Sequence, residues 1–347
     1  MNFSDLTPQQ VLDALDSVGQ RGDGRILQLN SYENRVFQVM LEAGDAVVAK
    51  FYRPQRWSNA QIVEEHRFAL ELAEAEVPVV PPLVLRAEPG AHGLTLHGEP
   101  ATLACVDEPG ISSRENRPGS GHRFAVAARC AGRQPELDDP DVLRQIGRFI
   151  GRLHSVGRRR PFEHRHVLNA RVDGARARDL LVNGGFVSAA ELPAWRTACD
   201  HALAVAVTAF DAAAPLTTLR LHGDCHPGNV LWRHSGAGSG PHVVDLDDAM
   251  QGPAVQDLWM LVSGDGPTMA RQLNTLLEGY EQFSDFDDRE RRLIEPLRTL
   301  RMVRHSAWLA ERWTDPSFPM NFSFFGSAAY WSQQTAQLRE QVEAMAG

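Results

Sequence analysis

The chain has 347 residues, a formal net charge of −9, 43% hydrophobic residues and 23% charged residues, as is usual for a globular enzyme. The net negative charge argues against a bulk attraction to nucleic acid, and no apolar run reaches the ~18–20 residues that span a bilayer. Four cysteines without a CxxC pair do not make a disulfide scaffold, so we expect a protein of the reducing cytoplasm. From the charge and the hydropathy we expect neither a nucleic-acid nor a membrane partner.

The first third of the chain predicts a lobe that is rich in strands. Alternation of apolar and polar residues predicts an antiparallel meander with extended segments at 25–31, 35–41 and 46–52. One helix is expected over 59–76, and "VPVVPP" (77–82) ends it because proline cannot continue a helix. Further extended segments are expected at 83–87, 93–97, 101–106 and 123–128. The Pro-, Gly- and Ser-rich stretch 107–122 predicts an exposed loop.

After residue 128 the pattern becomes helical. Apolar residues recur at helical spacing from Val142 to Val156, and again within 191–210 and 255–312. Strands followed by helices predict an α+β fold with two lobes, a sheet lobe over residues 1–128 and a larger helical lobe over 129–347.

Oxygen-bearing side chains cluster in "LRLHGDCHPGNVLWRHSGAGSGPHVVDLDDA" (219–249). A His-Gly-Asp turn precedes a predicted hairpin, and that order brings Asp224, Asn229 and Asp245 close together. Two carboxylates and an amide oxygen are a base and the hard ligands that a Mg²⁺-nucleotide requires.

The spacing of this motif resembles the protein-kinase pattern H-R-D-x-x-x-x-N, with glycine in place of arginine. It is similar to the version found in the aminoglycoside phosphotransferase and choline kinase branch of the kinase-like superfamily. The resemblance implies a bilobal kinase-like fold, with Asp224 as the catalytic base. It also implies that Asn229 and Asp245 bind Mg²⁺, Asp245 matching the catalytic aspartate of D-F-G.

Lys50 is the only lysine among 35 basic residues, and it ends the apolar segment "AVVAK". This segment resembles the kinase "VAIK" strand, whose lysine contacts the α- and β-phosphates of ATP and pairs with a glutamate on the next helix. Glu65 matches that glutamate, with its neighbour Glu64 as the other candidate. An ammonium is a compact donor that fits between phosphate oxygens, whereas a guanidinium is longer and forked.

The segment "LNSYENRV" (29–36) lies where kinases have a glycine-rich loop, but it contains no glycine. Backbone N–H groups from Ser31 to Asn34 and the Ser31 hydroxyl are candidates to bind phosphate, so both residues are predicted nucleotide contacts. A plain polar hairpin turn is the alternative.

Several neighbouring residues have predicted supporting roles. Asp247 is expected to face the site and assist the metal, whereas Asp248 is expected to be structural. The resemblance implies that Asp257 braces the catalytic loop, and His222 is expected to anchor it by hydrogen bonds. A catalytic contribution of His226 stays open.

Other classes of protein fit the motif less well. A metallophosphoesterase needs a D-x-H motif upstream of its G-D-x-H and a G-N-H-[ED] motif; the chain has no D-x-H before Asp224 and no G-N-H-[ED]. A zinc site from His222, Asp224, Cys225 and His226 is disfavoured because adjacent ligands fit tetrahedral geometry poorly. A non-catalytic pseudokinase remains a distinct alternative, although it usually lacks the lysine, the base or a metal ligand.

Longer blocks resemble the bacterial stress response kinase A family of protein Ser/Thr kinases. They include "LNSYENRVFQV", "VAKFYRPQRW", "VDLDDAMQGPAVQDLWML" and "WTDPSFPMNF" (313–322), whereas 107–122 and 158–190 show no likeness. The resemblance implies ATP and Mg²⁺ as cofactors, adenine against 124–128, and a protein Ser or Thr as acceptor, with the chain itself one candidate substrate. A small-molecule hydroxyl kinase is the alternative. No A-P-E motif follows Asp245, so regulation by activation-loop phosphorylation is not expected.

Overall fold

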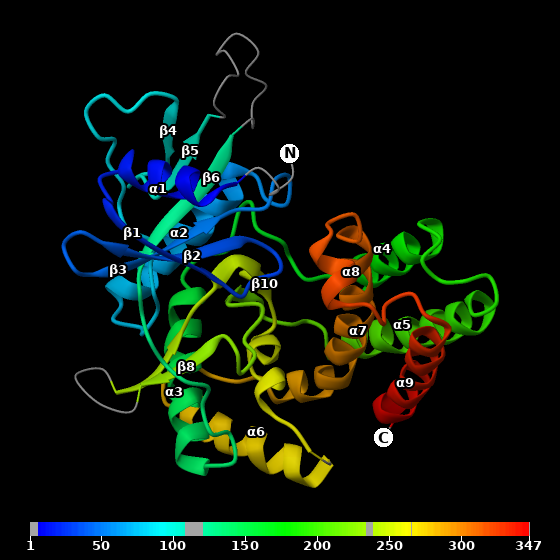
Figure 1. The fold of residues 1–347 in the computed structure, drawn as a ribbon. Helices are drawn as coiled ribbons and strands as arrows, with labels where there is room; N and C mark the ends of the chain where they lie inside the picture. The colour runs from blue at the N-terminus through cyan, green and yellow to red at the C-terminus, as the bar shows by residue number, and fades with distance from the viewer. Residues whose placement is uncertain (1–5, 108–120, 234–238, 265, 347) are drawn as a thin grey trace.

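The computed structural model describes residues 6–107, 121–233, 239–264 and 266–346, and its N-terminal part is an antiparallel sheet (Figure 1). The six strands are β1 (Gly22–Leu29), β2 (Arg35–Leu41), β3 (Ala46–Phe51), β4 (Leu94–His97), β5 (Leu103–Val106) and β6 (His122–Ala128). Their order in the sheet is β1-β2-β3-β6-β5-β4. The predicted α+β fold, with a sheet before a helical part, is confirmed.

The two faces of the sheet have different neighbours. Alternate residues of β2 and β3, including Phe37, Val39 and Val47, pack on one face with Val11 and Leu15 of helix α1 (Pro8–Asp16). The other face carries Lys50 and lies next to helix α2 (Asn59–Glu74) and the candidate site. Helix α1 was not predicted from the sequence.

The sheet differs from a simple meander. Strand β6 pairs with β3, and in this pairing Lys50 lies opposite Ala125. The edge of the sheet on this side is therefore β4, although β6 is the last strand of the sheet along the chain. Strand β1 begins and ends earlier than the expected 25–31. Residues 83–87 form no strand of the sheet, although Leu83 N–H donates to the carbonyl of Val126. Most of the expected loop 107–122 lies outside the described residues.

The C-terminal part is mainly helical, with two short two-stranded ladders near the sheet. The helices are α3 (Pro140–Gly157), α4 (Ala170–Asn183), α5 (Leu192–Ala213), α6 (Gly266–Tyr280), α7 (Ile294–Glu311), α8 (Ser317–Asn321) and α9 (Ala328–Ala346). The ladders pair β7 (Leu219–Leu221) with β10 (Met250–Gly252), and β8 (Val230–Arg233) with β9 (Gly240–Val243). The predicted helical stretch 255–312 contains 3₁₀ turns as well as α6 and α7.

The helices form two groups in Figure 1, α3 with α6 below the sheet and α4, α5, α7, α8 and α9 to one side. Helices α3 and α6 pack closely because Gly147 has no side chain; a Cβ there would lie 1.9 Å from the carbonyl oxygen of Leu276. Phe68 and Leu72 of α2 belong to the same apolar core as α3. The division at residues 128 and 129 stays a prediction.

Within the parts of the chain that the structure describes, no helix has both the length and the apolar character needed to cross a membrane.

Candidate active site

A cavity of about 890 Å³ lies between the sheet and the helical part, and most of the predicted site residues line it. Those residues are Ser31, Lys50, Glu65, Asp224, Asn229 and Asp245. Residues separated by almost 200 positions therefore meet at one hollow. Asn34, the remaining predicted residue, does not line the cavity.

One end of the cavity is apolar. Val36 and Val48 of the sheet, Leu231 of β8 and Val243 of β9 line it together with residues 125–128 of β6. An apolar slot beside exposed backbone suits a flat aromatic ring that also carries hydrogen-bonding groups. That adenine occupies this slot stays a prediction.

Lys50 reaches across the cavity to two carboxylates. Its Nζ lies 2.8 Å from Oδ1 of Asp245 and 3.6 Å from Oδ1 of Asp247. Burial disfavours the ammonium, but the two carboxylates outweigh that effect, so the pKa of Lys50 lies well above its usual value. Lys50 is therefore charged at every physiological pH.

The structure distinguishes the two glutamates that the sequence offered as partners of Lys50. The Glu64 carboxylate accepts hydrogen bonds from the backbone N–H groups of residues 163–165, so it holds that segment. Glu65 is only 6% exposed and lines the cavity. The expected ion pair differs, however: among the described residues Lys50 contacts Asp245 and Asp247, and Glu65 lies beyond 4 Å.

Burial raises the pKa of Glu65 from 4.5 to about 7, despite the favourable charge of Lys50. Between those two pH values Glu65 is protonated in the folded protein and ionised in the unfolded chain, so the free energy of unfolding falls as the pH rises. Between pH 4.5 and pH 7 the free energy of unfolding of Glu65→Gln should therefore fall by about 3 kcal/mol less than that of the wild-type protein. Urea unfolding of both proteins at the two pH values measures this difference.

Glu340, exposed on α9, supplies the matched control, and Glu340→Gln should keep the wild-type pH dependence. Burial also raises the pKa of Glu290 to about 7, so some pH dependence should remain in Glu65→Gln. An unchanged slope in Glu65→Gln would contradict the perturbed pKa.

The loop before Asp224 is held by a buried acid. Asp257 accepts hydrogen bonds from the backbone N–H of His222 at 2.7 Å and of Gly223 at 2.8 Å, and it contacts His154 at 3.0 Å. The His222 ring contacts the carbonyl of Val244 at 2.9 Å. The predicted supporting contacts of Asp257 and His222 are thus present.

The backbone of the loop at position 223 requires a glycine, where protein kinases have arginine. Its φ of +86° lies in the left-handed region, and a Cβ would approach the carbonyl oxygen of Asp248 to 2.1 Å. A larger side chain would push the loop away from β10 and displace Asp224.

The Asp224 carboxylate has basic neighbours on both oxygens. Oδ1 accepts a hydrogen bond from Arg301 of α7 at 2.6 Å, and Oδ2 lies 3.5 Å from Nε2 of His226. Burial disfavours the carboxylate, but these neighbours outweigh it and hold the pKa of Asp224 below its usual value. The sequence reasoning missed Arg301, which no motif marks.

Asn229 and Asp245 have oxygens that fit a hard divalent cation. The Asn229 side-chain nitrogen donates to the backbone oxygen of Asp224 at 3.0 Å. The Oδ1 atom of Asn229 accepts no hydrogen bond from the described residues. Asp245 is half exposed and has a left-handed φ of 61°. Two protein ligands suit Mg²⁺, which keeps waters and substrate phosphates in its shell.

In the described residues no group of three or more His, Cys, Asp or Glu side chains is arranged to hold a metal. The cluster at 222–226 that a zinc site would need is therefore not formed.

Asp247 and Asn34 lie beneath the cavity and do not face it. Asp247 is 3% exposed; its Oδ2 accepts from Asn34 at 3.1 Å and pairs with Arg56. The Asn34 side-chain oxygen accepts from the backbone N–H of Arg53. The Asn34 side chain is thus engaged by Asp247 and the backbone of Arg53, and a phosphate contact of its backbone N–H stays a prediction. Asp247 does not line the cavity, and its assistance to a metal also stays a prediction.

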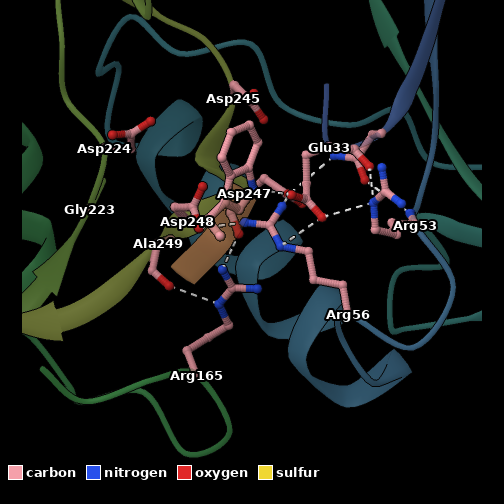
Figure 2. Close-up of polar contacts among 12 residues, drawn as sticks. Glu33, Arg53, Arg56, Arg165, Gly223, Asp224, Asp245, Asp247, Asp248 and Ala249 are labelled. Carbon is pink, nitrogen blue, oxygen red and sulfur yellow. Dashed lines mark hydrogen bonds and ion pairs between the residues drawn. The ribbon is translucent and has the colours of Figure 1, made fainter. Parts of the chain in front are cut away.

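Glu33 joins the loop without glycine to the helical part. Its carboxylate contacts Arg53 at 3.2 Å and Arg56 at 3.5 Å (Figure 2). It also accepts from Trp308 of α7 and from Arg312, which directly follows α7. Arg56 in turn pairs with Asp248 at 2.6 Å. Arg53 also donates to the backbone carbonyls of Tyr32 and Glu33, so these contacts hold this part of the loop in place.

A lysine on β3 and oxygen-bearing residues at the ends of the catalytic loop and hairpin, facing one cavity, define a kinase-like phosphotransferase. The model of the family described as "Phosphotransferase enzyme family" matches residues 25–294. Amicoumacin kinase hAmiN, solved in complex with AMP-PNP, Ca²⁺ and Ami, has a similar fold, with a TM-score of 0.68 and 16% identity over 97% of this chain and 93% of that one.

Two bacterial relatives are much closer in sequence. Stress response kinase A of Escherichia coli (strain K12) is 42% identical over 99% of this chain and 94% of its own length. "Serine/threonine protein kinase RdoA" of Salmonella typhimurium (strain LT2) is 41% identical over 98% and 94%. The chain therefore belongs to the stress response kinase A family of phosphotransferases, and it is a kinase.

Proposed function

We propose that the chain is an ATP- and Mg²⁺-dependent serine/threonine protein kinase that acts in the bacterial stress response. The observation that carries the proposal is that Lys50, Asp224, Asn229 and Asp245 all line one cavity. The names of relatives that match nearly the whole chain support the protein acceptor and the stress response.

In this proposal the nucleotide lies along the cavity. Its adenine occupies the apolar slot beside residues 125–128, and Lys50 contacts the α- and β-phosphates. The Ser31 hydroxyl, at the cavity wall, donates to a phosphate oxygen. Asn34 acts indirectly, by fixing Asp247 and the backbone of Arg53.

Asn229 and Asp245 would hold Mg²⁺, which neutralises charge on the transferred phosphoryl group when it is bound. Lys50 then has a second task in the free protein, because its ammonium keeps the Asp245 carboxylate in the cavity.

Asp224 orients the acceptor hydroxyl. Arg301 occupies its Oδ1, so Oδ2 takes the hydroxyl proton. The acceptor oxygen forms a bond to the γ-phosphorus of ATP while the bond to the leaving ADP oxygen breaks, and the proton passes to Asp224. The lowered pKa keeps Asp224 ionised and ready as a base.

Labelled ATP tests the acceptor class. Wild-type protein incubated with γ-labelled ATP, Mg²⁺ and a mixture of bacterial proteins should transfer acid-precipitable label to serine and threonine. The Asp224→Asn variant, prepared in the same way, controls for contaminating kinases.

Label confined to the small-molecule fraction would overturn the protein acceptor and favour a small-molecule hydroxyl kinase. Nucleotide binding without any transfer would favour the pseudokinase.

A further inference from the structure

The active-site cavity continues into a second groove. This groove of about 1,160 Å³ lies between the loop 53–57, helix α4 and helix α7. It shares wall residues with the active-site cavity, namely Arg56, Asp248, Met250, Arg304 and Trp308. The two hollows therefore adjoin, and Asp224 lines the first of them.

The size of the groove is more than a small acceptor needs. Pockets for drug-sized ligands have volumes of roughly 300–1,000 Å³. In the proposed function the first cavity, at about 890 Å³, takes the nucleotide, so the acceptor extends into the second groove. At about 1,160 Å³ that groove exceeds the range for a small acceptor and suits a longer one.

One cation of the groove has no carboxylate within ion-pair distance among the described residues. Each of the four carboxylates of the groove has a basic partner: Asp173 with His166, Asp248 with Arg56, Glu311 with Arg312, and Asp315 with Arg53. Arg304, at the junction of the two hollows, is half-buried and forms no ion pair with any residue that the structure describes; its charge reaches the Asp173 carboxylate only at longer range. An acidic ligand group can therefore pair with Arg304 directly.

Arg304 also lies one helical turn from the residue that contacts the predicted base. It follows Arg301, which contacts Asp224, by three positions, so both face the same side of α7. Three residues advance a helix by about 4.5 Å. An extended chain rises about 3.3 Å per residue and covers that distance in one or two positions.

We propose that the second groove binds an extended polypeptide acceptor, and that Arg304 selects an acidic side chain one or two positions from the phosphorylated hydroxyl. This inference rests on the proposed function and adds the sequence preference of its acceptor.

Paired synthetic peptides test the role of Arg304. Each pair has one serine and differs only in Glu or Gln at a neighbouring position, scanned over the two positions on either side. Wild-type protein should favour Glu over Gln by about tenfold in kcat/KM at one of these positions, the effect of one hydrogen bond to a charged group. Arg304→Gln should bring this Glu/Gln ratio near one. Arg304→Glu should instead favour a peptide that has Lys at the same position.

The matched control is Arg339→Gln, since Arg339 is exposed on α9 and lines neither hollow; it should keep the wild-type ratio. A Glu/Gln ratio that is the same in wild type and Arg304→Gln would overturn the assignment of Arg304 while leaving the protein kinase intact. A wild-type protein that phosphorylates no peptide and no protein would overturn both.

Peptide length tests the groove independently. Extending the flanks of the preferred peptide should lower its KM in wild-type protein. Thr314, exposed and lining only the second groove, can be enlarged without touching the first cavity. In Thr314→Trp the extended peptide should no longer have a lower KM than the short peptide, and the KM of the short peptide should be unchanged. A length effect that survives Thr314→Trp would exclude the groove as the binding path.

Discussion

Replacing Asp224 by asparagine should lower kcat about a thousandfold, because the amide keeps the shape of the side chain but cannot take the acceptor proton. The free energy of unfolding should change by less than about 1 kcal/mol, since the pair with Arg301 is partly exposed and screened by water. Single-turnover transfer of labelled phosphate measures the first effect and urea unfolding the second.

Asp138→Asn is the matched control, because Asp138 is exposed and lies outside the cavity. It should retain wild-type activity. If Asp224→Asn transferred phosphate as fast as wild type, Asp224 would lose its role as the base, and Arg301 would be an ordinary surface partner.

Replacing Lys50 by arginine should lower kcat/KM at least about a hundredfold, although the positive charge is retained. The Lys50 ammonium fits between the Asp245 and Asp247 carboxylates at 2.8 and 3.6 Å, and a longer, forked guanidinium changes both contacts. Steady-state kinetics at varied ATP concentration should show the loss, with nucleotide titration as a separate measure of binding.

Lys50→Met removes the charge and should also destabilise the fold. Oδ1 of Asp247 is buried without a hydrogen bond, and the ammonium is the cation beside it. Arg339→Lys, an exposed exchange of the same two residue types, should change neither property. Wild-type kinetics in Lys50→Arg would show that only the charge at this position matters.

Local patterns predicted the strands well where one face is buried. In β3 every second residue is buried, which is the alternation that the sequence shows. The same reasoning placed β6 last along the chain but not beside β3, because strand pairing depends on contacts between distant residues. Helix α1 was missed because it is short. A helix of this length is stable mainly through packing, here against Phe37 and Val39 of the sheet.

Short-range spacing also predicted the residues around the cavity. Asp224 and Asn229 are five positions apart on one loop, so the loop itself brings them together. The contact between Asn34 and Asp247 was not predicted, because a polar residue near a site looks the same in the sequence whether its side chain faces a ligand or another side chain. Only burial distinguishes the two cases.

The sequence by itself determined the groups that the proposed chemistry uses: one ammonium at the end of a strand, and two carboxylates with an amide oxygen at short spacing on a loop and hairpin. The tertiary structure decided which charges meet. Arg301 lies 77 positions from Asp224, and Glu33 lies 279 positions from Arg312. Contacts at such separations depend on how α7 packs against the sheet and the loops, and backbone periodicity carries no information about that packing.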